Sequence, residues 1–222
     1  MDTIYYCIKF FLDGGAFMYP ILLVFAVGIA IAIERWFKLS SSMKRNRRTW
    51  DELQPVLQDG DFDRAREFTG KSDTELGMVL SLGLSRQGSV RRRDDIEIAM
   101  EEGMMEIIPQ LEKRTPYLAI LANVATLLGL LGTIVGLIQA FTAVANANPS
   151  EKANLLSGAI AVAMNTTAFG LMVGIPLLLM HTFLTAKTTE IVDSLEMAQV
   201  KTLNVITEFA RQDTTTKGAA NG

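Results

Sequence analysis

The chain has 222 residues, 49% of them hydrophobic, with a mean hydropathy of +0.25 and a formal net charge of −3. A soluble protein of this size is rarely so apolar, and the small net charge gives no sign of nucleic-acid binding. Three stretches carry no charge at all: residues 16–33, 115–150 and 153–186. Because roughly 20 apolar residues cross a bilayer as a helix, the sequence predicts an all-α membrane protein with three transmembrane helices.

The N-terminal segment is apolar and aromatic up to the break Asp13-Gly14-Gly15. Its pattern predicts an interfacial helix over residues 1–15, lying on lipid at the outer face of the membrane. The single cysteine, Cys7, has no partner in its own chain, so a free thiol is expected there. The first transmembrane helix is expected over residues 16–37, and the absence of a small-residue cleavage site after it argues against a signal peptide.

Basic residues set the orientation. Of the chain's 21 lysines and arginines, 14 lie between Lys38 and Arg114, one lies in the loop after the second apolar stretch, and one precedes the first. Because lysine and arginine are retained on the cytoplasmic side, residues 38–115 are predicted to form a cytoplasmic domain. The N-terminus is then periplasmic and the C-terminus cytoplasmic.

Residues 38–115 follow a helical pattern. Gly60 is typical of a helix end, and Asp61 of the N-cap of the next helix. A stripe spaced by three and four residues predicts one buried helix face, made of Ile96, Met100, Met104, Ile107 and Leu111. We expect Pro109 and Pro116 to kink this helix without ending it, so that it continues into the second span. The run Arg91-Arg92-Arg93 precedes two aspartates and is interpreted as a solvated loop, not as a nucleic-acid site.

The remaining chain completes the expected topology. The second transmembrane helix is expected over residues 116–146, a periplasmic turn over 147–152 and the third transmembrane helix over 153–187. Residues 188–222 are expected to form a cytoplasmic helix with a disordered tail after Arg211. The second and third apolar stretches exceed the thickness of a bilayer, so both helices should extend into the cytoplasmic domain.

Small residues recur at a spacing of four in both long spans. Gly132 and Gly136 form such a pair in the second span, and Gly170 and Gly174 form one in the third. In lipid, helices associate through close backbone approach at small residues. The sequence therefore predicts that these glycines pack helices together.

Polar side chains inside the apolar stretches are the candidate site. Thr133 is the deepest polar residue on its face of the second span, and Asn165, Thr166 and Thr167 stand together in the third. A hydroxyl can be satisfied by a carbonyl of its own helix, but Thr133 and Thr167 lie on glycine-bearing faces at similar depth. We expect these two to meet across the helix contact. Successive residues on a helix differ by about 100°, so the three residues at 165–167 cannot face one lumen.

Ionisable residues are missing from the second and third spans, apart from His181 near the inner end. A proton path normally uses an ionisable group within the membrane, so another chain would have to supply it. One histidine, one cysteine and no cluster of acids leave no catalytic constellation. No enzyme activity, resident cofactor or protein-bound metal is expected.

Two motifs at matching depth, LLGLLGTIVG at 127–136 and NTTAFGLMVGIP at 165–176, accompany the DGDFDRA turn at 59–65 and the IIPQLEKR segment before the second span. With these features the chain resembles the MotA/TolQ/ExbB family of inner-membrane ion-channel subunits, over roughly residues 16–205. In layout it is most similar to ExbB and TolQ. The resemblance implies a bacterial inner-membrane subunit of an ion-driven rotary motor that works on the cell envelope.

The resemblance also implies partners and residue roles. It implies a homopentamer around a dimer of a single-span MotB/TolR/ExbD-like protein, whose aspartate titrates. Thr133 and Thr167 would present their hydroxyls to the ion. Two departures from the family pattern stand out: Val162 replaces a glutamate usual in TolQ and ExbB, and Thr126 follows Ala125 where the family has proline.

The transported ion stays open at this stage. A proton needs a titratable acid and a water path, whereas Na⁺ needs several oxygen ligands. Thr133, Thr166 and Thr167 could supply oxygens to Na⁺, and Asn165 adds one more. The alternative from a different class is a structural membrane scaffold without ion conduction. A secondary transporter is disfavoured because the chain has neither internal repeats nor a broken span.

Overall fold

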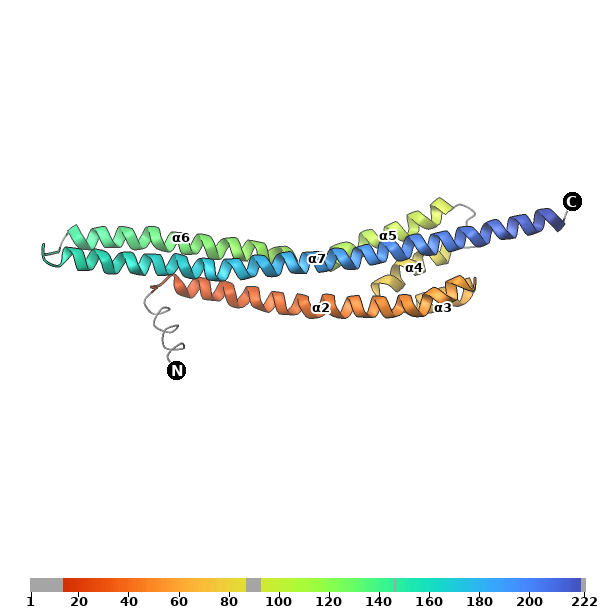
Figure 1. Cartoon of the computed structure of the whole chain (residues 1–222), viewed down its shortest axis with the longest axis horizontal. Coiled ribbons are helices and arrows are strands. Elements are labelled where there is room, and N and C mark those ends of the chain that lie inside the picture. Colours follow the sequence, from red (N-terminus) through yellow and green to blue (C-terminus); the bar gives the residue numbers. More distant parts are fainter. Residues whose placement is uncertain (1–13, 87–92, 146, 221–222) are drawn as a thin grey trace. The chain divides into compact units, whose positions relative to one another are not determined.

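The computed structural model describes residues 14–86, 93–145 and 147–220, and side chains as far as Arg211. Within these ranges the chain is all helical and contains no strand (Figure 1). The helices are α2 (Met18–Gln58), α3 (Phe62–Gly70), α4 (Glu75–Arg86), α5 (Arg93–Glu112), α6 (Thr115–Ala145) and α7 (Lys152–Ala220). The predicted all-α class is confirmed. Cys7, Arg91, Arg92 and nearly all of the expected interfacial helix lie outside the described residues.

Two compact units make up the chain. We call Met1–Arg35 with Arg114–Leu184 the apolar unit, and Trp36–Lys113 with Thr185–Gly222 the polar unit. The apolar unit takes the first part of α2, all of α6 and the first part of α7. The polar unit takes α3, α4, α5 and the remaining parts of α2 and α7.

Three helical stretches are long and apolar enough to cross a membrane, within Met18–Gln58, Arg93–Ala145 and Lys152–Arg211. Only 22%, 28% and 28% of the most apolar window of each stretch is buried within the chain. Apolar side chains therefore cover most of the outside of the apolar unit, which suits lipid or neighbouring chains but not water. The prediction of three spans is confirmed.

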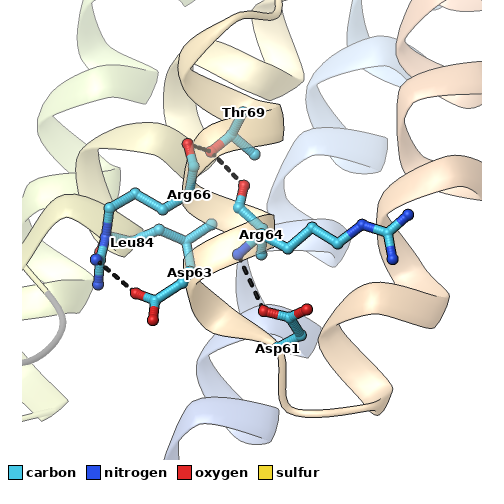
Figure 2. Close-up of polar contacts among 7 residues, drawn as sticks. Asp61, Asp63, Arg64, Arg66, Thr69 and Leu84 are labelled. Carbon is cyan, nitrogen blue, oxygen red and sulfur yellow. Dashed lines mark hydrogen bonds and ion pairs between the residues drawn. The ribbon is translucent and has the colours of Figure 1, made fainter.

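The turn between α2 and α3 follows the pattern of glycine and aspartate. Gly60 has φ +74°, a conformation that side chains disfavour, and α2 ends two residues before it. The Asp61 carboxylate accepts a hydrogen bond of 3.1 Å from the backbone N–H of Arg64, as an N-cap does (Figure 2). The predicted turn is confirmed.

Helix α3 is fixed to its neighbour by Arg66. Its Nε donates to the carbonyl of Leu84 in α4 at 3.0 Å, and Nη1 donates to Asp63 at 3.1 Å (Figure 2). Thr69 donates back to Ala65 in its own helix. A short helix of nine residues is marginal alone, so these bonds and packing against α4 hold it in place.

Helices α4 and α5 pack together and carry much of the core of the polar unit. The predicted stripe of α5 is confirmed, because all five of its members are at most 5% exposed. Close approach is needed at Gly83 and Gly103, where an added Cβ would meet Met100 and Leu82 respectively. The buried apolar residues contributed by α4 are Leu76, Val79, Leu80 and Leu84.

The expected continuous helix from α5 into the second span is wrong. Pro109 lies inside α5, but the helix stops at Glu112, and Arg114 has φ +69° before α6 begins at Thr115. Pro116 has no N–H to bond the carbonyl of Glu112, so the ladder of hydrogen bonds cannot run through it. The first turn of a new helix tolerates proline without this loss.

Helices α2 and α7 run parallel in the polar unit. The Lys187 ammonium lies 4.5 Å from the ring centroid of Trp36, and that of Lys201 lies 5.8 Å from the ring centroid of Trp50. Both pairs are separated by 151 residues (187 − 36 and 201 − 50), so the register is constant over 14 residues. Fourteen residues are two heptads, the repeat at which paired helices keep the same faces together.

The C-terminal segment differs from the expected disordered tail, because α7 continues to Ala220. The sequence has no proline after Arg211. Adding a residue to an existing helix fixes only that residue and gains a hydrogen bond.

Candidate functional site

Helices α6 and α7 run alongside each other in the apolar unit (Figure 1), and glycines bring their backbones into contact. A Cβ added to Gly129 would lie 3.2 Å from the Cα of Gly170, and one added to Gly170 would lie 2.8 Å from the carbonyl oxygen of Ala125. A methyl group at Gly170 would force a backbone shift, and one at Gly129 would require the backbone of α7 to move by a few tenths of an ångström. The two helices therefore cross as closely as their backbones allow.

The four glycines singled out from the sequence all lie at this contact. An added Cβ on Gly132 would meet the Thr166 side chain, and one on Gly136 would lie 3.0 Å from the Cβ of Ala163. On α7, a Cβ added to Gly174 would lie 2.6 Å from the hydroxyl oxygen of Thr126. The sequence pattern missed Gly129, although it lies three residues before Gly132 on the same helix face.

Thr167 spans the contact. Its hydroxyl donates a hydrogen bond of 2.9 Å to the carbonyl of Gly129 on α6. In an α-helix the N–H of residue 133 bonds the carbonyl of residue 129, so Thr167 shares this acceptor with the backbone of Thr133. The two threonines are linked through one carbonyl, not by a bond between their hydroxyls.

Thr133 itself satisfies its hydroxyl locally. It donates 2.6 Å to the carbonyl of Leu130, one turn back on α6, and the side chain is partly exposed. Asn165 is also partly exposed, one residue before the buried Thr166. The described residues thus place Thr133 and Asn165 where a neighbouring molecule can reach them.

Thr166 has a different environment. It is 2% exposed, and its hydroxyl donates to the carbonyl of Gly14 at 2.7 Å and contacts that of Val162 at 3.1 Å. Gly14 precedes α2, so Thr166 fastens the entry of the first span to α7. Gly14 was missed by the sequence pattern, which marked Asp13-Gly14-Gly15 only as a break. The hydroxyls of Thr133, Thr166 and Thr167 therefore donate to three different carbonyls.

An ion pair joins α2 to the break before α6 in the apolar unit. Arg114, in the break between α5 and α6, donates 2.5 Å to Glu34 of α2, and both side chains are about half exposed. Neighbouring Arg35 is 1% exposed. The described residues contain no group of three or more histidine, cysteine, aspartate or glutamate side chains suited to a metal ion.

Comparison with known proteins gives these features a family context. Residues 71–197, more than half of the chain, match the MotA/TolQ/ExbB proton channel family. This chain belongs to that family. The matched region includes the glycine contact, Thr133 and Thr167. The family comprises membrane proteins of the ion-channel and transport type, not enzymes, and the three apolar helices make this member a multi-pass membrane protein.

Individual relatives named ExbB-like, exbB1 and TolQ match between 42% and 82% of this chain. A protein named ExbB-like 1 from Synechocystis sp. is 28% identical over 190 residues, which span 82% of this chain and 72% of the relative. Biopolymer transport protein exbB1 of Vibrio cholerae is 27% identical over 166 residues, 73% of this chain and 72% of its own. The Tol-Pal system protein TolQ of Haemophilus influenzae is 36% identical over 93 residues, 42% of this chain and 40% of TolQ. The similarity to ExbB and TolQ agrees with the expected layout.

Proposed function

We propose that the chain is the ion-conducting subunit of an inner-membrane motor complex that converts ion-motive force into mechanical work in the cell envelope. The proposal places the N-terminus in the periplasm and the polar unit and C-terminus in the cytoplasm. The spans are residues 16–37, 116–146 and 153–187. Membership of a proton channel family and similarity to biopolymer transport and Tol-Pal proteins support this role.

One observation carries the proposal. The longest uncharged stretches, residues 115–150 and 153–186, meet through bare backbone, and the hydroxyl of Thr167 bonds the carbonyl of Gly129 at that contact. Threonines often hydrogen-bond across close helix contacts in lipid, and this one lies between two stretches that carry no charged side chain of their own. The Thr167 hydroxyl uses its proton in this bond, so its oxygen keeps lone pairs that a passing cation can contact.

The proposed pathway is formed by Thr133, Asn165 and Thr167. Thr133 and Asn165 are partly exposed on the single chain, so an ion or a partner helix can reach their oxygens. Thr166 is the least suited of the four residues expected from the sequence, because it is buried and its hydroxyl is committed to two carbonyls. We assign it to fastening the entry of the first span.

The subunit requires a partner in this proposal. Spans two and three contain no carboxylate, so the group that titrates comes from a single-span MotB/TolR/ExbD-like protein, two copies of which occupy the centre of a homopentamer. Exposed apolar residues on α6 and α7 provide the surfaces for lipid and for neighbouring subunits. They include Leu127, Leu131, Ile138, Phe141, Met164, Met172 and Leu179.

The test is ion flux into liposomes that contain the chain with and without its co-purified single-span partner. We expect flux only with both proteins, and Thr133→Val should reduce it at least tenfold while Thr133→Ser retains it. The valine variant must still assemble with the partner at the wild-type ratio. Equal flux with and without the partner would falsify the proposed division of roles.

The identity of the ion follows from the same liposomes. We propose a proton, because the hydroxyls of Thr133, Thr166 and Thr167 turn to three separate carbonyls and do not form one ring of ligands for Na⁺. Replacing Na⁺ by K⁺ at constant proton-motive force should leave the flux unchanged. A drop after this replacement would establish Na⁺ as the ion.

A structural scaffold is the alternative function. It predicts that the partner-containing liposomes show no flux above that of empty liposomes, although the complex assembles. The glycine contact alone suits both functions, so the flux measurement decides between them.

A further inference from the structure

The polar unit contains a cavity that none of the proposed pathway residues lines. It has a volume of about 340 Å³ and lies between α2 and the segment that joins α3 to α4. Small-molecule pockets begin at about 300 Å³, so a compact ligand would fit. The lining residues are Arg45, Arg48, Thr49, Glu52, Phe68, Lys71, Ser72 and Thr74.

Three cations and one carboxylate line this cavity. Arg45, Arg48 and Glu52 lie on one face of α2, because positions three, four and seven apart on a helix share a face, and Lys71 faces them from the end of α3. The net charge of the lining is +2 (three cations minus one anion). Arg45 forms no salt bridge among the described residues, so none of their carboxylates pairs with its guanidinium group.

The other two cations are held only by exposed ion pairs. Arg48 contacts Glu52 at 2.9 Å, and Lys71 contacts Glu67 at 2.6 Å, with side chains 48–83% exposed. The hydrogen bond from Lys71 lowers the pKa of the exposed Glu67 carboxyl. Exposed pairs of this kind contribute about 0–1 kcal/mol. A multivalent anion that contacts Arg45 can therefore draw Arg48 and Lys71 to itself.

The inner wall of the cavity consists of ordered hydroxyl groups. Thr74 donates to Thr49 at 3.2 Å and lies 2.8 Å from the hydroxyl of Ser72, and it accepts the backbone N–H of Gly77 at 3.1 Å. Thr49 and Thr74 are 7% and 8% exposed. Because Thr49 accepts the bond from Thr74, its own proton remains available as a donor. Guanidinium, ammonium and hydroxyl donors around one space are the groups that bind phosphate oxygens.

We propose that this cavity binds a phosphate ester. The phosphate would contact Arg45, Arg48 and Lys71, with Thr49 as a further donor, and the organic part would pack on the half-buried ring of Phe68. Two sources carry this chemistry: a soluble phosphate ester such as a nucleotide, and the headgroup of an anionic phospholipid. The site adds a cytoplasmic ligand to a subunit whose proposed ion pathway lies in the other unit.

The test compares two double variants of the full-length protein in nanodiscs. Arg45→Gln with Lys71→Gln removes two cations that line the cavity. Lys44→Gln with Arg47→Gln removes two exposed cations from the same stretch of α2 that do not line it. Both variants change the net charge by the same amount. Circular dichroism checks that each keeps the helix content of the wild type.

The probes separate the two sources. In phosphatidylcholine nanodiscs, adenosine diphosphate and glycerol 3-phosphate are titrated by thermophoresis. In nanodiscs that also contain phosphatidylglycerol, native mass spectrometry counts the phosphatidylglycerol molecules retained per chain. Saturable binding of a soluble ester supports a soluble ligand, and retention of one extra phosphatidylglycerol without such binding supports a lipid headgroup.

If the ligand is a soluble ester, Arg45→Gln with Lys71→Gln should weaken its binding at least tenfold; if it is a lipid, the same variant should no longer retain the extra phosphatidylglycerol. Lys44→Gln with Arg47→Gln should change either signal less than twofold. Arg45→Gln alone should show an intermediate loss. Equal losses in the two double variants would show general electrostatic attraction and overturn the proposal. Absence of both soluble binding and variant-dependent lipid retention would also overturn it.

Discussion

The hydroxyl of Thr167 on α7 and the backbone of Thr133 on α6 share the carbonyl of Gly129 as an acceptor. Glycine at position 129 favours this arrangement, because a Cβ there would lie 3.2–3.3 Å from the backbone of α7, which would have to move by a few tenths of an ångström. The hydroxyl of Thr167, the carbonyl of Gly129 and the close helix contact therefore depend on one another. Substitutions at Thr167 and at the glycines should therefore affect ion flux and stability differently.

Replacing Thr167 by valine keeps the shape of the side chain and removes the donor. Gly129 keeps its helical hydrogen bond, so we expect a loss of about 0.5–1.5 kcal/mol in stability, too little to prevent assembly. Partner-dependent ion flux should fall at least tenfold. Thr167→Ser, which keeps the hydroxyl, should retain more than half of the flux. If valine and serine behave alike in liposomes, the hydroxyl has no part in conduction.

Gly170→Ala should disrupt the helix contact. Its Cβ would lie 2.8 Å from the Ala125 carbonyl oxygen and 3.0 Å from the Cα of Gly129, and backbone cannot move aside cheaply. Overpacking of this kind typically costs about 1–3 kcal/mol. Thermal unfolding in detergent should shift to lower temperature.

Gly158→Ala is the matched control on the same helix, because nothing lies within 4 Å of its Cβ position. Alanine favours a helix interior over glycine by about 1 kcal/mol, so this change should leave stability equal or raise it. A loss of the same size in both variants would mean that the close contact is not the cause.

Thr166→Val should loosen the entry of the first span without removing a pathway hydroxyl. It deletes the hydrogen bond to Gly14 and leaves that buried carbonyl with one partner fewer, at an expected cost of about 1–3 kcal/mol. Protease sensitivity near residue 14 should rise. Thr182→Val is the control, since Thr182 is exposed and bonds only to Leu178 of its own helix. If Thr166→Val lowers the ion flux without changing the protease sensitivity, Thr166 belongs to the pathway instead.

Asp61→Ala should destabilise the polar unit. The change removes the N-cap of α3, worth typically about 1 kcal/mol. Asp61→Asn keeps a capping oxygen and should restore most of the stability, and Asp59→Ala, which removes the same charge two residues earlier, should have little effect. Denaturant midpoints of the purified protein measure the three variants. Equal losses for Asp59→Ala and Asp61→Ala would point to charge instead of capping.

The sequence by itself determined the helical class, the three spans and the turn at Gly60 and Asp61. These features depend on local properties: the length of an uncharged stretch, the spacing of apolar residues along α5, and the conformations that glycine and aspartate favour. The motifs around Thr133 and Thr167 also sufficed to indicate the family. Local patterns gave one helix the wrong length, since Pro116 lies in the first turn of a new helix after the break at Arg114 and does not kink a continuous one.

Only the tertiary structure decided what each polar side chain bonds. Thr166 and Thr167 are neighbours in sequence, yet the 100° step between them directs one hydroxyl to Gly14 and the other to Gly129. Neither acceptor can be found from helical spacing, because both partners are distant in sequence. The cavity beside Arg45 arises in the same way, from side chains of α2 and of the segment after α3 that only packing brings together.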